Sequence, residues 1–339
     1  LAHGGTGIYT VDGNVNITGT GKNGFDLDFD QGVVLESTGL GNIFVESTNT
    51  SNSGTSIIFY AGTNTVRTTG SGSITVEAAR NIDLQGANFS TNTGTLTLRA
   101  NTDGTTPGNF VGLSLNNSQL SSNSGTIALT GVGGNAGTGN RGIFLQNNSR
   151  ISTDTGAIDL TGTGGIEGYG VSLNNAQIFS DAGVIDLTGT SNSNTLGIGV
   201  DHINNASIST NTGDIIVSGT GSLGAGGRNI GVVIAAPITS TTGAINITGN
   251  ATGTGTENHG IFFNSGAGQV ASSSGVTTLT GLGGSDATSQ GISAPIGTLG
   301  SVTGTGDLNL FADRMNLVDA TVTGLGKLTI APVTANTDF

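Results

Sequence analysis

Glycine marks a period of about thirty residues along this chain. Twelve anchor glycines are followed, two and four positions later, by residues that are apolar in 23 of 24 cases, Thr277 being the exception. They are Gly13, Gly41, Gly72, Gly94, Gly125, Gly156, Gly183, Gly213, Gly243, Gly275, Gly306 and Gly326. An apolar residue at every second position is typical of a strand with one buried face. A recurring unit of this length predicts a stacked array, hence one elongated body.

Two more apolar segments precede the anchor glycine in each central repeat. The first has its apolar residue five positions before the glycine, at Phe89, Leu120, Ile151, Ile178, Ile208, Ile238 and Val270. The second, further upstream, is seen at 112–115, 142–145, 170–173 and 260–263, where a glycine begins each segment. Three short strands per repeat predict an all-β fold, a parallel β-helix (β-solenoid) of about twelve three-strand coils.

Stacking explains why such coils would be stable together and not alone. A coil cannot bury its own Ile and Leu row, whereas its neighbours above and below cover that row and pair with its strands. Burial of each inward Leu or Ile contributes about 1.5–3 kcal/mol before conformational entropy is subtracted. Twelve coils at ~4.8 Å per strand spacing predict a rod of roughly 55–60 Å.

The whole chain, 1–339, is predicted to be a single elongated β-solenoid. Its coils are expected to be less regular over 1–93, regular over 94–305 and short over 306–339. The irregularity is visible five positions before the outer anchors, where the apolar residue is replaced by Glu36, Arg67, Ser301 and Thr321. Leu35 and Val66 stand one place earlier.

Glycine-rich connections of uneven length follow the same strand in successive coils. Clear examples are 131–141, 162–169, 219–230 and 249–259. Because they leave equivalent strands, they are expected to emerge along one edge of the rod, where loops are free to differ.

Composition excludes several classes of partner. A net charge of −13 opposes binding to nucleic acid or anionic lipid through phosphate contacts. No stretch approaches 18 consecutive apolar residues, so no membrane insertion is expected. The chain contains no Cys, which excludes disulfides and thiol chemistry. Neither end has an obvious polar capping segment, which predicts either a piece of something longer or self-association end to end into fibres.

Asparagine recurs eight positions before four successive anchors, at Asn117, Asn148, Asn175 and Asn205, with a second Asn just before each. Turns favour Asn because it tolerates left-handed backbone conformations. The structural prediction is a ladder of side-chain amides that hydrogen-bond along the stack.

Two sets of aspartates are candidates for chemistry. Asp159 and Asp186 occupy the same outward position in adjacent coils, which predicts a separation of ~5 Å, as in a retaining glycosidase. A solvated carboxylate pair is the competing interpretation.

Asp26, Asp28 and Asp30 alternate in a strand and would face one side, where hard oxygen ligands could hold Ca²⁺. The Gly-rich nonapeptide of calcium-binding β-rolls is missing, so a charged solvent face is the alternative. No other cofactor is expected. His3, His202 and His259 have no second ligand at a metal-site spacing and are expected at the surface.

The chain resembles the filamentous haemagglutinin-like exoproteins, large secreted adhesins of Gram-negative bacteria and cyanobacteria. The likeness rests on the repeated segment 142–162, its variants from 112 to 281, and the tail 326–332. It implies a right-handed β-helix shaft that is exported to the cell surface or a secreted matrix.

Two functions remain in view. The first is a non-enzymatic structural or adhesive fibre segment, whose loop edge contacts a cell-surface glycan or protein. The second is a polysaccharide lyase or glycoside hydrolase built on a β-helix, with Asp159 and Asp186 as its acid pair. That enzyme would need a cleft flanked by basic and aromatic residues.

Overall fold

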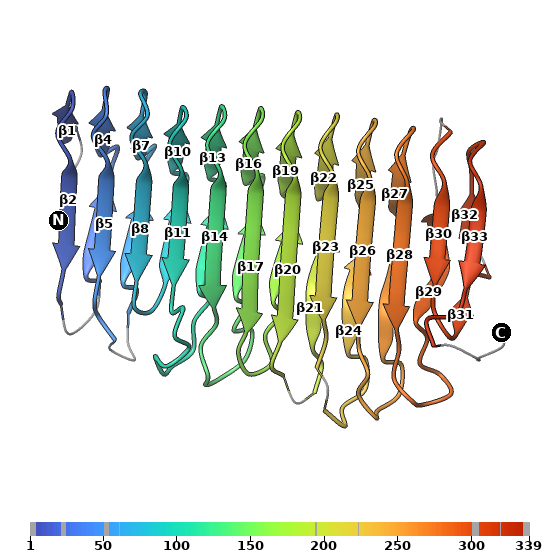
Figure 1. Ribbon diagram of the computed structural model, residues 1–339. Helices are drawn as coiled ribbons and strands as arrows, with labels where there is room; N and C mark the ends of the chain where they lie inside the picture. Colours follow the sequence, from blue (N-terminus) through green and yellow to red (C-terminus); the bar gives the residue numbers. More distant parts are fainter. Residues whose placement is uncertain are drawn as a thin grey trace.

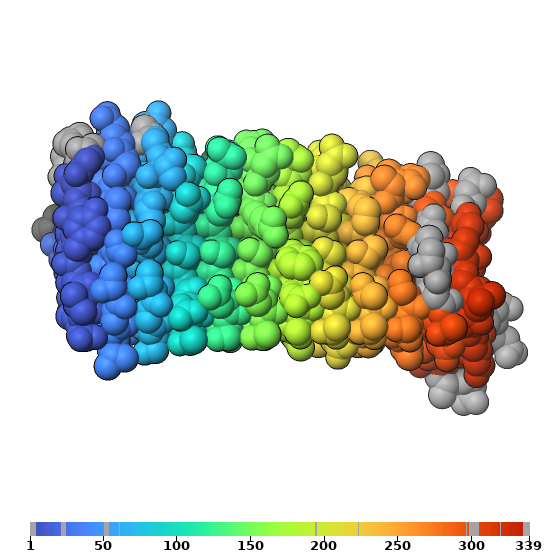
Figure 2. All heavy atoms as spheres, turned by 90° about the horizontal axis from the view of Figure 1, so that it is seen from above, coloured from blue at the N-terminus to red at the C-terminus, as the bar shows by residue number. Residues whose placement is uncertain are grey.

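The computed structural model describes residues 5–21, 25–50, 54–60, 62–193, 195–222, 224–299, 305–318 and 320–334, apart from the side chains at 296, 298 and 299. Its secondary structure is all β, and every described strand pair is parallel. The chain forms a right-handed parallel β-helix, so the predicted fold is confirmed. Figure 1 shows the coils side by side along one axis, and Figure 2 shows the resulting elongated body.

Each anchor glycine introduces one strand of a twelve-stranded sheet, the anchor stack. Its strands are β2 (Val15–Gly19), β5 (Ile43–Ser47), β8 (Ile74–Ala78), β11 (Leu96–Ala100), β14 (Ile127–Val132), β17 (Ile158–Gly164), β20 (Ile185–Ser191), β23 (Ile215–Thr220), β26 (Ile245–Asn250), β28 (Thr277–Leu282), β30 (Leu308–Phe311) and β33 (Leu328–Ala331).

The strand that precedes the anchor glycine forms the second stack. It contains β1 (Gly7–Thr10), β4 (Val34–Ser37), β7 (Thr65–Thr68), β10 (Asn88–Thr91), β13 (Gln119–Ser122), β16 (Arg150–Thr153), β19 (Gln177–Ser180), β22 (Ser207–Thr210), β25 (Pro237–Ser240), the ends of β27 (His259–Ser272) and β29 (Ile292–Leu299), and β32 (Ala320–Val322).

The third stack lies upstream of the second in each coil. It contains β3 (Leu27–Asp30), β6 (Ile57–Tyr60), β9 (Ile82–Gln85), β12 (Leu113–Asn116), β15 (Ile143–Gln146), β18 (Val171–Asn174), β21 (Ile198–Ile203), β24 (Ile230–Ile234), the beginnings of β27 and β29, and β31 (Met315–Asn316). Because β27 and β29 each run through both stacks, the second and third stacks form one 21-stranded sheet.

One apolar core runs through the described coils. Like side chains stack on like, for example Ile158 on Ile185 and Leu160 on Leu187. A single cluster of buried apolar residues extends from Val15 to Ala312. The seven apolar residues predicted five places before an anchor are all 1% exposed or less. Thr277, the one polar residue in the inward pattern, is also fully buried.

Two columns of glycine are required by close backbone approach. A Cβ on Gly183 would overlap the carbonyl of Gly156 in the preceding coil, and the same relation recurs from anchor to anchor. A second column ends the anchor strands, where a Cβ on Gly162 would overlap the carbonyl of Gly170 at the start of the third stack. The anchor glycines therefore mark the places where neighbouring coils touch through backbone alone.

The irregular early coils keep their core by lengthening one turn. Leu35 and Val66 pair with each other and are buried, so the inward position is six places before the anchor there. Glu36 and Arg67 face outward and form an ion pair at 2.8 Å. Ser301 lies outside the described residues. In the last coil the inward row passes to the residue after Thr321, because Val270 pairs with position 299 and position 299 pairs with Val322.

The connections after the anchor strands leave the rod on one edge, as predicted. Figure 1 shows these loops beyond the ends of β14, β17, β20 and their neighbours. Asn140, Asn229 and Asn258 are completely buried at the base of the loops. Asn229 and Asn258 are linked from coil to coil, because the Oδ1 atom of Asn258 accepts a hydrogen bond from the backbone N–H of Asn229 at 2.8 Å. These buried asparagine side chains fix the loops against the third stack.

Candidate functional site

The outer face of the third stack carries a groove formed by two rows of side chains. The outward row follows the strand register and contains Asp83, Ser114, Phe144, Ser172, Asp201, Val233 and Phe262. The second row stands where each strand begins and contains Arg80, Val111, Arg141, Tyr169, Ile198, Ile230 and His259. We call the space between these rows and the overhanging loops the outer groove.

The outer groove has two main cavities, which meet at Arg141. One, of about 590 Å³, lies between Arg80, Phe110, Phe144 and the 54–55 segment. The other, of about 560 Å³, lies over β21 and β24. Its far wall is supplied by the connections, at 195–196 and 227–228. Both cavities lie along the coil axis, since their lining residues come from successive coils.

Arg141 forms no close ion pair with a carboxylate among the described residues, although its charge acts on Asp201 in the same cavity. Its guanidinium carbon lies 4.3 Å from the ring centre of Phe144 and 5.3 Å from that of Tyr169. Its Nε atom is buried without a hydrogen-bond partner. Aromatic faces attract such a cation, but they leave the Nη groups at its edge free to bind an anion.

The cavity over β21 and β24 has an apolar floor. Ile198, Ile230 and Val233 are nearly completely buried in a small cluster outside the main core, and Tyr169 and Phe262 pack against them. Apolar side chains on the outer face of a solenoid do not contribute to the main core. This cluster therefore makes the outer groove different from the polar faces elsewhere on the rod.

Asp201 places a buried carboxyl beside that floor. It is 4% exposed, and the Ser172 hydroxyl donates to its Oδ2 atom at 3.3 Å. Burial raises the pKa of Asp201 to about 6, against smaller opposing effects of Ser172 and Arg141. Near neutral pH this group can accept hydrogen bonds, and in mild acid it can also donate one.

Two of the three histidines are described, and the surface prediction is wrong for His202. This residue points into the core between Leu173 and Ile234, is completely buried, and has no hydrogen-bond partner for either ring nitrogen. Burial lowers the pKa of His202 to about 3. His259 is half-buried and stacks on Phe262, and its Nδ1 atom accepts a hydrogen bond from the backbone N–H of Gln290 at 3.1 Å. His3 lies outside the described residues.

The asparagine turns have the expected left-handed backbone, with φ of 51° at Asn117, 66° at Asn148, 52° at Asn175 and 57° at Asn205. Amides hydrogen-bond from coil to coil, but the bonds alternate between the two asparagine columns. They join Asn147 to Asn116 at 2.9 Å, Asn175 to Asn148 at 3.1 Å and Asn204 to Asn174 at 3.2 Å. The ladder therefore has one amide bond at each step and serves the stack, as the structural prediction expects.

Asp159 and Asp186 are directly paired on the outer face of β17 and β20. Asp159 is exposed and Asp186 is partly buried, and partial desolvation raises the pKa of each carboxyl, with the charge of Asp186 adding to the effect at Asp159. Their neighbours in the same row are Ala128 and Ile216. Neither aspartate lines the outer groove, so the acid pair and the basic, aromatic groove lie on different stacks.

The three aspartates near β3 do not form the predicted calcium set. Asp28 and Asp30 face outward, opposite Ile58 and Tyr60 of the next coil. Asp26 accepts hydrogen bonds from the Gly21 amide and the Ser47 hydroxyl instead. Within the part of the chain that is described, no three His, Asp or Glu side chains are grouped to hold a metal ion.

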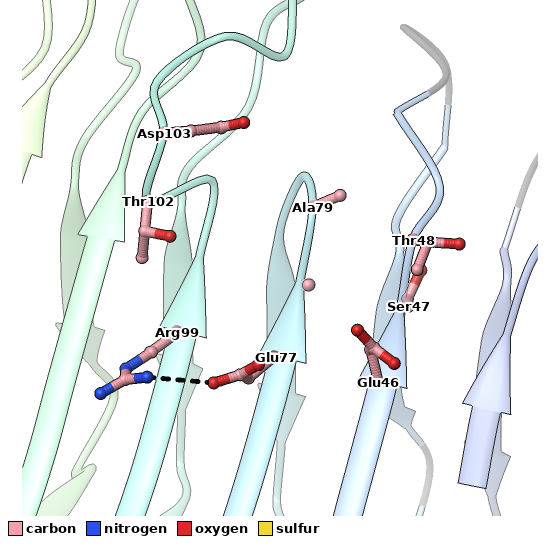
Figure 3. Close-up of a pocket in the computed structure, with 9 residues that line it drawn as sticks. Glu46, Ser47, Thr48, Glu77, Ala79, Arg99, Thr102 and Asp103 are labelled. Atoms are coloured by element: carbon pink, nitrogen blue, oxygen red, sulfur yellow. Dashed lines mark hydrogen bonds and ion pairs between the residues drawn. The ribbon is translucent and has the colours of Figure 1, made fainter.

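A smaller pocket of about 350 Å³ lies at the ends of β5, β8 and β11. Figure 3 shows Glu46, Glu77 and Arg99 in its wall, with Asp103 reaching over from the following loop. Arg99 and Glu77 form an ion pair at 3.2 Å in adjacent coils. Both side chains are substantially exposed, so this pair holds little energy. The pocket has polar walls and no enclosed reactive group.

Sequence reasoning missed the outer groove. Its residues recur at fixed positions of the repeat but differ in type from coil to coil, so they carry no periodic signal. One signal was present, since the strand sequences around Asp201, Val233 and Phe262 place large or charged residues at an outward position that holds Ser in β12 and β18.

Comparisons with protein-family models, with curated proteins and with solved structures found no significant match. Among the described residues, no helix has both the length and the apolar character needed to cross a membrane.

Proposed function

We propose that this chain is a non-enzymatic structural or adhesive segment of a secreted cell-surface or matrix fibre. The observation that carries the proposal is the single apolar core, which extends through the described coils from Val15 to Ala312. A rod made this way holds its surfaces at fixed intervals over a long distance. That property suits a spacer or a multivalent contact surface.

The resemblance to filamentous haemagglutinin-like exoproteins supports the same proposal. It rests on the repeated segment 142–162, whose three strands and two turns recur in the neighbouring coils. We infer an extracellular location from this likeness, at the cell surface or in a secreted matrix.

End-to-end association is part of the proposal. The last described anchor strand, β33, leaves Leu328 43% and Ile330 45% exposed on the side where a further coil would stack. Equivalent residues in β17 and β20 are completely covered. A further coil, from this chain or from a second copy, would cover them and continue the parallel hydrogen bonding.

A glycan-cleaving enzyme is the second candidate, because the outer groove is flanked by Arg80, Arg141, Phe144 and Tyr169. Such a surface is what a polysaccharide lyase or hydrolase on a β-helix would need. The acid pair Asp159 and Asp186 lies on another stack, however, and a substrate in the groove would not reach it. The groove therefore supports binding better than cleavage.

We expect the purified protein to form rods and to leave glycans intact. Negative-stain electron microscopy measures the first, with a shaft of at least roughly 55 Å expected from twelve strand spacings. Incubation with acidic and neutral polysaccharides, followed by assays for new reducing ends and for unsaturated products, measures the second. Steady turnover that the Asp159→Asn variant abolishes would contradict the proposal in favour of the enzyme, and compact globules in the micrographs would contradict the shaft.

A further inference from the structure

The outer groove concentrates basic side chains. Three of the chain's nine basic residues lie in it or on its rim, Arg80, Arg141 and Arg228. Arg80 donates hydrogen bonds to the backbone carbonyls of Gly54 and Asn109. Arg228 forms an ion pair with Glu257 at 3.4 Å. Arg141 alone of the three has neither kind of partner among the described residues.

We propose that the outer groove binds an extended glycan strand that carries carboxylate groups, with one carboxylate held by Arg141. This inference deepens the adhesive function proposed above and rests on it. Sugar rings would lie on the apolar floor of Ile198, Ile230 and Val233, beside Tyr169.

The geometry of Arg141 fits a planar anion. Phe144 covers a face of the guanidinium at 4.3 Å, and its Nε atom is buried. The donors left are the Nη groups at the edge of the fork, where a carboxylate can bind in a bidentate manner. In a partly desolvated groove such a charge-assisted pair is stronger than a pair of exposed ions.

The direction of the groove fits a linear polymer. Equivalent positions recur at each strand spacing of ~4.8 Å along the axis, which is close to the length of one pyranose ring in an extended chain. Consecutive rings would therefore meet consecutive coils, from Arg141 past Tyr169 toward Phe262. Asp201 and Asn264, which both line this cavity, offer polar groups for ring hydroxyls along this path.

The negative charge of the whole chain means that binding of an acidic glycan has to depend on residues in the groove. A net charge of −13 repels polyanions at long range, so the attraction has to come from the groove itself. A single change at Arg141 should then remove most of the selectivity for an acidic over a neutral ligand.

The test is titration calorimetry with hexameric oligogalacturonate and with its fully methyl-esterified form, which has the same rings without the charges. We expect the unmodified protein to bind the acid at least about tenfold more tightly than the ester. In Arg141→Gln we expect the acid to lose that advantage while the ester binds as before. The matched control is Arg150→Gln, because Arg150 also lies over a ring, Phe179, at 5.8 Å, but belongs to the second stack.

Each result decides between outcomes. Equal affinities of the unmodified protein for acid and ester, an equal loss in Arg150→Gln, or no binding of either probe would each overturn the inference. The acid and ester comparison needs no variant, so it stands even where Arg141→Gln fails to fold. If the protein forms rods and leaves glycans intact but binds neither probe, the proposed structural function stands and the outer groove is not its contact surface.

Discussion

Replacing Gly183 by Ala should lower the free energy of unfolding by about 2–3 kcal/mol. The added Cβ would overlap the carbonyl of Gly156, which belongs to the backbone of the preceding coil. A backbone atom cannot rotate away as a flexible side chain can, so the two coils must separate locally and weaken the pairing of β17 with β20. Urea denaturation followed by circular dichroism measures the change.

Gly13→Ala is the matched control for this prediction. Gly13 is the anchor glycine of the first described anchor strand, and its added Cβ would meet only Thr10 at 3.6 Å, an ordinary contact. Ala in place of Gly restricts the unfolded chain, so this variant should gain about 0.4–1 kcal/mol. Equal effects of the two substitutions would contradict the close approach of successive anchors.

Replacing His202 by Leu should raise the free energy of unfolding at pH 7 by about 1–3 kcal/mol. Both ring nitrogens of His202 are buried without partners, whereas the coils on either side place Leu173 and Ile234 at this position. The substitution removes the cost of two unpaired polar atoms and continues an apolar row. Thermal or urea unfolding of the two proteins at pH 7 measures the gain.

The gain should grow as the pH falls. The pKa of His202 is lowered from 6.5 to about 3 in the folded state, so the unfolded chain takes up a proton that the folded chain refuses. Between about pH 6.5 and pH 3 the folded state should lose up to about 5 kcal/mol from this group. Asp201, whose pKa is raised to about 6, acts in the opposite direction, since its folded carboxyl loses stability as pH rises from about 4 to 6.

Between about pH 4 and pH 6, rising pH therefore stabilises the folded protein through His202 and destabilises it through Asp201. In His202→Leu only the effect of Asp201 remains, so stability should fall more steeply with rising pH than in the unmodified protein. His259→Leu serves as the comparison, since His259 accepts a hydrogen bond from Gln290 and should not gain stability when replaced. A His202→Leu protein that is less stable than the unmodified one at pH 5 would contradict the buried, unpaired position of this ring.

The fold was predictable from the sequence because its strongest constraints are periodic. The anchor glycines mark backbone contacts between coils, and the alternate apolar residues that follow them, such as Ile158 and Leu160, are completely buried or nearly so. The early coils were harder to interpret because one extra turn residue moves Glu36 and Arg67 to the position where an apolar residue was expected.

The groove could not be predicted in the same way. Arg141 meets Tyr169 because adjacent coils place residues about thirty apart side by side, and nothing in the local sequence of either residue predicts that contact. Phe144, the other ring beside Arg141, lies three positions later in the same coil. His202 was mistaken for a surface residue because a lone polar residue usually is one. The alternation of β21 in fact places it inward, two positions after Val200.

Cysteine cross-linking tests the stacked parallel register most directly, because the chain contains no Cys of its own. Asp159 and Asp186 are paired in adjacent coils, where a strand spacing of ~4.8 Å allows a disulfide. In the double variant Asp159→Cys with Asp186→Cys we expect complete, intramolecular oxidation. In Asp159→Cys with Thr188→Cys, which is offset by two residues and separated by ~8 Å, we expect none. A bond in the offset pair, or its failure in the paired positions of a folded protein, would contradict the β-helix register.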